Sequence, residues 1–139
     1  MRFLLIAPVI LLAACNAEPQ PPLVASNVEI TAPMPGATVW AGYMVLTNNS
    51  GTDILIDSVS SPQFGAVELH ETAVENGVAR MRPVSELLIR PGQSVQLARG
   101  GLHLMMMQPQ RDIESVTLNL HSGDLLLMSL QTSPTFKGN

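Results

Sequence analysis

The sequence has little charge and only one cysteine, and these shortages exclude several classes of protein. Charged residues make up 13% of its 139 residues, about half of the usual roughly 25%, and the seven basic residues form no cluster. Because nucleic-acid binding requires a basic patch, we exclude nucleic-acid partners. The single cysteine, Cys15, permits no disulfide within the chain. A hydrophobic content of 46% is too high for a disordered chain.

Turn residues and methionine, by contrast, are plentiful. The chain contains 10 glycines, 11 prolines and 8 methionines, and its apolar segments are short and separated by turn residues. This pattern predicts an all-β fold, an antiparallel Greek-key sandwich or barrel, with no helix. We expect strands at Val24–Thr31, Thr38–Asn48, Asp53–Ser60, Ala66–Glu71, Val78–Arg82, Glu86–Ile89, Ser94–Ala98, Leu102–Met107, Ser115–His121 and Leu125–Gln131.

The first residues are typical of a bacterial lipoprotein signal. The apolar stretch that follows Met1-Arg2 is too short to cross a bilayer, which takes about 20 residues. It ends in Leu12-Ala13-Ala14-Cys15, which resembles a lipobox, the motif whose cysteine thiol receives the lipid. We therefore predict a periplasmic protein, anchored to a membrane through lipidated Cys15. An ordinary cleaved signal peptide that happens to contain a cysteine is the alternative.

These observations divide the chain into four segments. We predict a signal peptide at 1–14, a lipidated cysteine with a Pro-rich tether at 15–23, one β-domain at 24–132 and a short polar tail at 133–139.

Two short segments each present one histidine and one methionine. His70 and Met81 flank Asn76-Gly77, which is the strongest short signal for a β-hairpin. A two-residue turn there pairs Thr72 with Met81, whereas a four-residue loop would pair His70 with Met81; both registers put the two side chains on one face. In the second segment, His103 and Met105 are two residues apart and share a face of a strand.

Two imidazoles and two thioethers form a neutral, soft set of donors that favours copper(I). Calcium and magnesium require oxygen ligands, and zinc sites use cysteine, histidine and carboxylate. A blue-copper centre needs a cysteine thiolate, and the only cysteine here is expected to carry lipid. Among the remaining candidates, we expect His121 to be structural or on the surface, and the methionines to fill gaps in the core; these are Met34, Met44, Met106, Met107 and Met128.

The spacing of His70, Met81, His103 and Met105 resembles the copper(I) motif of the periplasmic copper chaperones of the PCu(A)C family. The surrounding segments resemble the family as well: they are Ala41–Met44, Leu69–Thr72, Met81–Val84, Leu88–Gly92 and Gly100–Met107. The resemblance implies a cupredoxin-like fold, copper(I) as the bound metal, and delivery of copper to the Cu(A) site in subunit II of cytochrome c oxidase, with a Sco-like protein as a further partner. The C-terminal extension rich in histidine and methionine that many members carry is absent from Gln131–Asn139, which puts a second copper site in doubt.

The sequence leaves three functions open. The first is a copper(I) carrier without catalysis, since no nucleophile–base pair or carboxylate dyad is evident. The second is a lipoprotein that sequesters copper for tolerance, and the third is a structural or adhesive lipoprotein of the periplasm. Copper content separates the third from the others.

Overall fold

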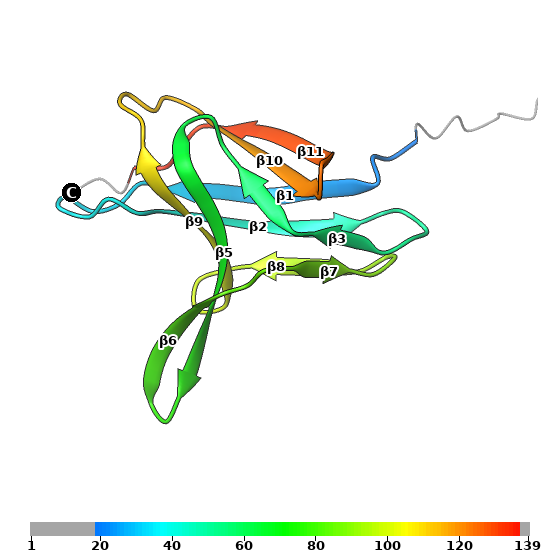
Figure 1. Cartoon of the computed structure of the whole chain (residues 1–139), viewed down its shortest axis with the longest axis horizontal. Coiled ribbons are helices and arrows are strands. Elements are labelled where there is room, and N and C mark those ends of the chain that lie inside the picture. The colour runs from blue at the N-terminus through cyan, green and yellow to red at the C-terminus, as the bar shows by residue number, and fades with distance from the viewer. Residues whose placement is uncertain (1–18, 137–139) are drawn as a thin grey trace, which may run out of the picture.

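The computed structural model describes residues 19–136, and these residues form strands and no helix (Figure 1). The strands are β1 (Leu23–Thr31), β2 (Trp40–Asn48), β3 (Ile54–Ile56), β4 (Ser58–Ser60), β5 (Phe64–Glu75), β6 (Val78–Pro83), β7 (Leu87–Ile89), β8 (Ser94–Leu97), β9 (Leu102–Pro109), β10 (Val116–Ser122) and β11 (Leu125–Thr132). The predicted signal peptide and Cys15 lie outside the described residues. None of the described residues belongs to a helix that could cross a bilayer.

Nine of the strands form one sheet that curls into a barrel. Its order is β1-β2-β9-β5-β4-β10-β11, with β6 added to β5 and β8 added to β2, and every strand pair is antiparallel. The segment after β11 returns to β1, where the Thr135 N–H donates to the Ile30 carbonyl at 2.7 Å. The predicted all-β, antiparallel fold is confirmed.

Alternation along β2 and β10 supplies much of the core. In β2, every second residue from Trp40 to Asn48 is buried, and in β10, Val116, Leu118 and Leu120 are buried while the residues between them are not. Asn48 is a buried polar exception with full hydrogen bonding: its Nδ2 donates to the Thr52 and Ile89 carbonyls, at 2.8 Å each. Burial of this apolar set is the main force that holds the barrel together.

Two sequence-based expectations about these elements are wrong. Asp53–Ser60 is divided into β3 and β4, because the Asp57 N–H donates instead to the His121 carbonyl at 3.1 Å. The Asp57 carboxylate then accepts the Gly123 N–H at 2.7 Å, which holds this break against the β10–β11 turn. Met34, expected to be packed, is 72% exposed in the β1–β2 loop, where no strand places it over the core.

The hairpin of β5 and β6 has the register predicted from its two-residue turn. Asn76 and Gly77 have φ of 52° and 77°, as the favoured hairpin turn requires, and Thr72 is the partner of Met81. The alternative with a four-residue loop is therefore wrong. The hairpin projects well beyond the barrel (Figure 1), because the pairing of β5 with β9 ends at Glu71 while its pairing with β6 continues to Glu75. For the same reason β5 is longer than the expected Ala66–Glu71.

Candidate metal site

Three strands bring the four predicted ligands to one face of the sheet. In β9, Leu104 and Met106 point into the core, so His103 and Met105 point to the opposite face. In β5, Val67 and Leu69 pack against the core, so His70 points to the outer face as well. Met81 in β6 shares that outer face, because it lies opposite Thr72, two residues along from His70.

His70 and His103 are direct partners across β5 and β9. Their ring centroids are 6.2 Å apart and the ring planes are inclined by 42°. Metal–imidazole bonds are about 2.0–2.1 Å long in zinc sites, so a metal ion lies roughly 3 Å from the centre of each ring that binds it. Rings about 6 Å apart can therefore share one ion. The separation of the two rings fits a shared metal.

The two methionines lie at different depths beside this pair. Met105 is partly buried, and its partner in β5 is Glu68. Met81 is 51% exposed on the projecting hairpin. The site is thus closed on the side of His103, which is buried, and open on the side of Met81.

The hydrogen bonds of the two imidazoles differ. His103 Nδ1 lies 2.9 Å from the carbonyl of Gly101, which also accepts the Thr72 N–H at 3.1 Å. Because a carbonyl only accepts, His103 Nδ1 carries the proton and Nε2 has the free lone pair. His70 Nε2 lies 2.8 Å from Glu68 Oε2, and His70 Nδ1 is buried with no hydrogen-bond partner among the described residues.

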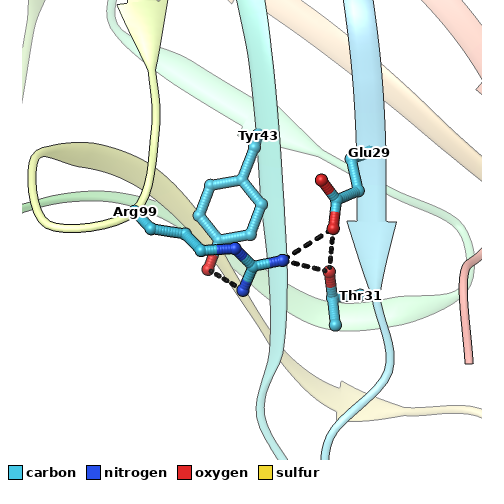
Figure 2. A network of polar contacts seen from close by, with 4 residues as sticks. All are labelled: Glu29, Thr31, Tyr43 and Arg99. Atoms are coloured by element: carbon cyan, nitrogen blue, oxygen red, sulfur yellow. Dashed lines mark hydrogen bonds and ion pairs between the residues drawn. The ribbon is translucent and has the colours of Figure 1, made fainter. Parts of the chain in front are cut away.

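An ion-pair network fixes the loop that carries Gly101 (Figure 2). The Arg99 guanidinium lies over the Tyr43 ring, 4.5 Å from its centroid, and donates to Glu29 Oε1 at 2.6 Å and to Thr31 Oγ1 at 3.4 Å. Arg99 therefore connects the loop before β9 to both β1 and β2. Gly101, two residues further along the same loop, holds the ring of His103, so the network supports the site from outside.

Glu68, Gly101 and the Arg99 network were missed by the sequence-based reasoning. Glu68 had a usable signal, because it stands two residues before His70 and so shares its face of β5. The contacts of Gly101 and Arg99 had no such signal in the sequence, since they depend on which strands become neighbours in the fold. His121, which we expected to be structural or on the surface, lies in β10 with its Nε2 3.3 Å from Ser60 Oγ.

The described residues contain no group of three or more His, Cys, Asp and Glu side chains placed to hold a metal. A site made of these ligands alone, as zinc prefers, is therefore absent from residues 19–136. An apolar cavity of about 360 Å³ is lined by core side chains such as Met44, Leu69 and Leu104. Leu69 and Leu104 point to the core face of β5 and β9, and neither His70 nor His103 lines the cavity, although Glu68 does.

Comparisons with solved structures show which known proteins share this fold. The copper-bound PCuAC domain from PmoF2 is 16% identical, with a TM-score of 0.63 over 85% of this chain and 94% of that domain. The solution structure of CuI-DR1885 from Deinococcus radiodurans is 29% identical, with a TM-score of 0.60 over 91% of this chain and 84% of that protein. The predicted resemblance to PCu(A)C proteins and the predicted fold are confirmed.

Comparisons of sequence identify the family. The "Putative lipoprotein Lxx21020" of Leifsonia xyli subsp. xyli (strain CTCB07) is 35% identical over 85 residues, which are 57% of this chain and 51% of that protein. The chain thus spans about half the length of this curated relative. The model of the family described as "Putative lipoprotein LpqE-like" matches residues 23–125. Since this match covers most of the chain, the protein belongs to the LpqE-like lipoprotein family and has the fold of a PCuAC domain.

Proposed function

We propose that the protein is an extracytoplasmic copper(I) carrier that binds one copper(I) ion through His70, Met81, His103 and Met105. The observation that carries this proposal is the pairing of β5 with β9, which sets His70 opposite His103. The same pairing and the β5–β6 hairpin add two thioethers to that face of the sheet. Copper-bound and CuI forms in the names of two structural neighbours support the choice of metal.

The chemistry of the donors favours copper(I) over harder ions. Thioethers are soft, neutral ligands, and neutral imidazoles add no charge, so the bound ion keeps its single positive charge. The absence of a cluster of histidine, cysteine and carboxylate ligands among residues 19–136 disfavours zinc. His70 Nδ1 is buried and has no hydrogen-bond partner among the described residues, so its lone pair is available to bind a metal ion.

The open side of the site favours transfer over storage. Met81 is 51% exposed, and it stands on a hairpin that contacts the barrel only at its base. An acceptor can therefore approach the metal from this side and replace the weak thioether bonds one at a time. A protein that sequesters copper gains nothing from such an exposed ligand, so we favour delivery over tolerance.

The cellular role follows from the resemblance to the PCu(A)C family. We propose that the acceptor is the Cu(A) site of cytochrome c oxidase, with a Sco-like protein as a second partner, and that the protein performs no catalysis of its own. We further propose that lipidated Cys15 holds the protein at a membrane in the periplasm. The word lipoprotein in the descriptions of the family and of the Leifsonia relative supports this location.

Anaerobic titration of copper(I) against a chromophoric chelator tests the function. We expect a stoichiometry near one copper(I) per chain, and loss of tight binding when His70 and His103 are both replaced by glutamine. The same pair of substitutions should leave the circular dichroism spectrum unchanged. A stoichiometry of zero in the folded wild-type protein would contradict the proposal. Transfer to a purified Cu(A)-type domain, measured by the absorbance of the acceptor, then tests delivery.

A further inference from the structure

The two histidines of the site make their hydrogen bonds through different ring nitrogens, His103 through Nδ1 and His70 through Nε2. Gly101 accepts the proton of His103 Nδ1 at 2.9 Å, which leaves His103 Nε2 with its lone pair. Glu68 Oε2 lies 2.8 Å from His70 Nε2. A carboxylate accepts and does not donate, so the proton of His70 is on Nε2 and the lone pair is on Nδ1.

The burial of His70 Nδ1 supports a neutral His70 ring with its proton on Nε2. This Nδ1 is the one side-chain nitrogen or oxygen among residues 19–136 that is buried and has no hydrogen-bond partner. A buried polar atom without a partner is destabilising, because it has lost its hydrogen bonds to water and gained none in the protein. If His70 were a cation paired with Glu68, Nδ1 would carry a proton that no acceptor receives. A neutral ring with a lone pair at Nδ1 avoids burying a charge, and a ligand bound at Nδ1 would satisfy the atom.

Glu68 lies close to two of the proposed ligands, one along its own strand and one across the sheet. It precedes His70 by two residues in β5, and its partner across the sheet is Met105 in β9. The carboxylate thus lies on the face that carries the proposed ligands. The Glu68 side chain is 51% exposed and that of His70 is 14% exposed, so the carboxylate keeps much of its hydration while it accepts the imidazole proton.

We propose that Glu68 is a positioning residue: it holds His70 in the tautomer with a free Nδ1, so that His70 binds copper(I) through Nδ1 and His103 binds it through Nε2. The part of this inference that concerns copper rests on the proposed function. Carboxylates that orient metal-binding histidines typically affect metal affinity by 10–100-fold when they are removed. As a hard oxygen ligand, Glu68 itself is poorly suited to copper(I) and acts through the histidine.

The tautomers can be measured without copper, by long-range ¹H–¹⁵N correlation in the detergent-solubilised full chain labelled with ¹⁵N-histidine. In the wild-type protein we expect a protonated Nε2 and a free Nδ1 for His70, and the reverse for His103. In the Glu68→Leu variant we expect a mixture of tautomers for His70 and no change for His103. Glu68→Gln keeps an accepting oxygen but also carries an NH2 group that can donate, so it should restore the wild-type tautomer only in part. Glu71→Leu, on the opposite face of the same strand, is the matched control.

Copper(I) supplies the second measurement. We expect affinity to fall ten-fold or more in Glu68→Leu, to fall less in Glu68→Gln and to stay unchanged in Glu71→Leu. On binding, the ¹⁵N resonance of His70 Nδ1 should shift in the wild-type protein. A protonated Nδ1 in the wild-type protein, or an unchanged tautomer in Glu68→Leu, overturns the positioning role, whatever copper does. The expected tautomers with no copper binding at all would overturn the proposed function and the coordination through Nδ1, while the role of Glu68 in fixing the tautomer would stand.

Discussion

His70 and His103 stand directly opposite each other on β5 and β9, with ring centroids 6.2 Å apart. No local feature of the sequence brings them together, because they are thirty-three positions apart in the chain. The contact exists because β9 is inserted between β2 and β5, which are distant from it along the chain. The site therefore depends on long-range pairing of strands, and it forms only when the barrel has formed.

The thioethers are the first features to test. Replacing Met81 or Met105 by leucine keeps the volume and removes the sulfur, so the fold should survive with less than about 1.5 kcal/mol of destabilisation. We expect copper(I) affinity to fall about ten-fold in each variant, which equals about 1.4 kcal/mol. Competition with a chromophoric chelator measures the affinity, and thermal unfolding checks the fold. Met34→Leu, in the exposed β1–β2 loop, is the control. Unchanged affinity in both ligand variants would remove methionine from the site.

Much of the fold could be predicted from the sequence because its signals are local. The alternation of Val116, Leu118 and Leu120 with polar residues predicts a strand with one buried face, and Asn76-Gly77 favours a two-residue turn, whose register the structure shows. The division of Asp53–Ser60 into two strands could not be predicted, since it results from a contact with the β10–β11 turn far along the chain.

In the candidate site too, the local relationships could be predicted and the long-range contacts could not. The shared face of His103 and Met105 follows from a period of two, and the structure shows it. The neighbours that orient the imidazoles lie beyond such rules: Gly101 contacts His103 through a bend before β9, and Arg99 reaches back to β1. Resemblance to a family supplied the ligand set, but it says nothing about which nitrogen of each ring is free.

The turn of the β5–β6 hairpin should be sensitive to a single methyl group. Gly77 has φ of 77°, a conformation in which an L side chain costs roughly 1–2 kcal/mol. We therefore expect Gly77→Ala to destabilise the protein by about 1 kcal/mol and to raise amide exchange in the hairpin around Met81. Gly51→Ala is the matched control, because an added Cβ there meets no atom within 4 Å and no positive φ is involved. Equal stability of the two variants, measured by urea unfolding, would contradict the account of the turn.

Arg99 should matter more to the geometry of the site than to global stability. Its ion pair with Glu29 is half-exposed, and such pairs contribute about 0–1 kcal/mol. We expect Arg99→Gln to lower the free energy of unfolding by no more than about 1 kcal/mol. Amide exchange at Thr72 should nevertheless accelerate, because its N–H donates to Gly101 in the loop that Arg99 fixes. Arg111→Gln removes the same charge from an exposed side chain and should leave exchange at Thr72 unchanged.

Attachment to the membrane can be tested apart from copper. If Cys15 is the lipidated first residue of the mature protein, mass spectrometry of the membrane fraction should find the diacylglyceryl group on that residue. Cys15→Ser should abolish the modification, because serine lacks the thiol that receives the lipid. Copper(I) affinity should remain the same, since no predicted ligand lies near Cys15 in the sequence. A wild-type protein with a free thiol at Cys15 would refute the anchor.

The choice between copper and zinc provides the sharpest test of the donor set. Catalytic zinc sites commonly use three protein ligands drawn from histidine, cysteine and carboxylate, and residues 19–136 contain no such group. Wild-type protein should therefore bind zinc weakly, and Met105→Leu should not change that affinity. Met105→His adds a third imidazole two residues from His103 on the same face of β9. We expect this substitution to raise zinc affinity at least ten-fold and to narrow the preference for copper(I), as measured by competition between the two metals.

The variant Met34→His adds the same group far from the site and should bind zinc as the wild type does. Tight zinc binding by the wild-type protein, or no gain in Met105→His while the fold is intact, would show that the two imidazoles and two thioethers do not form one site.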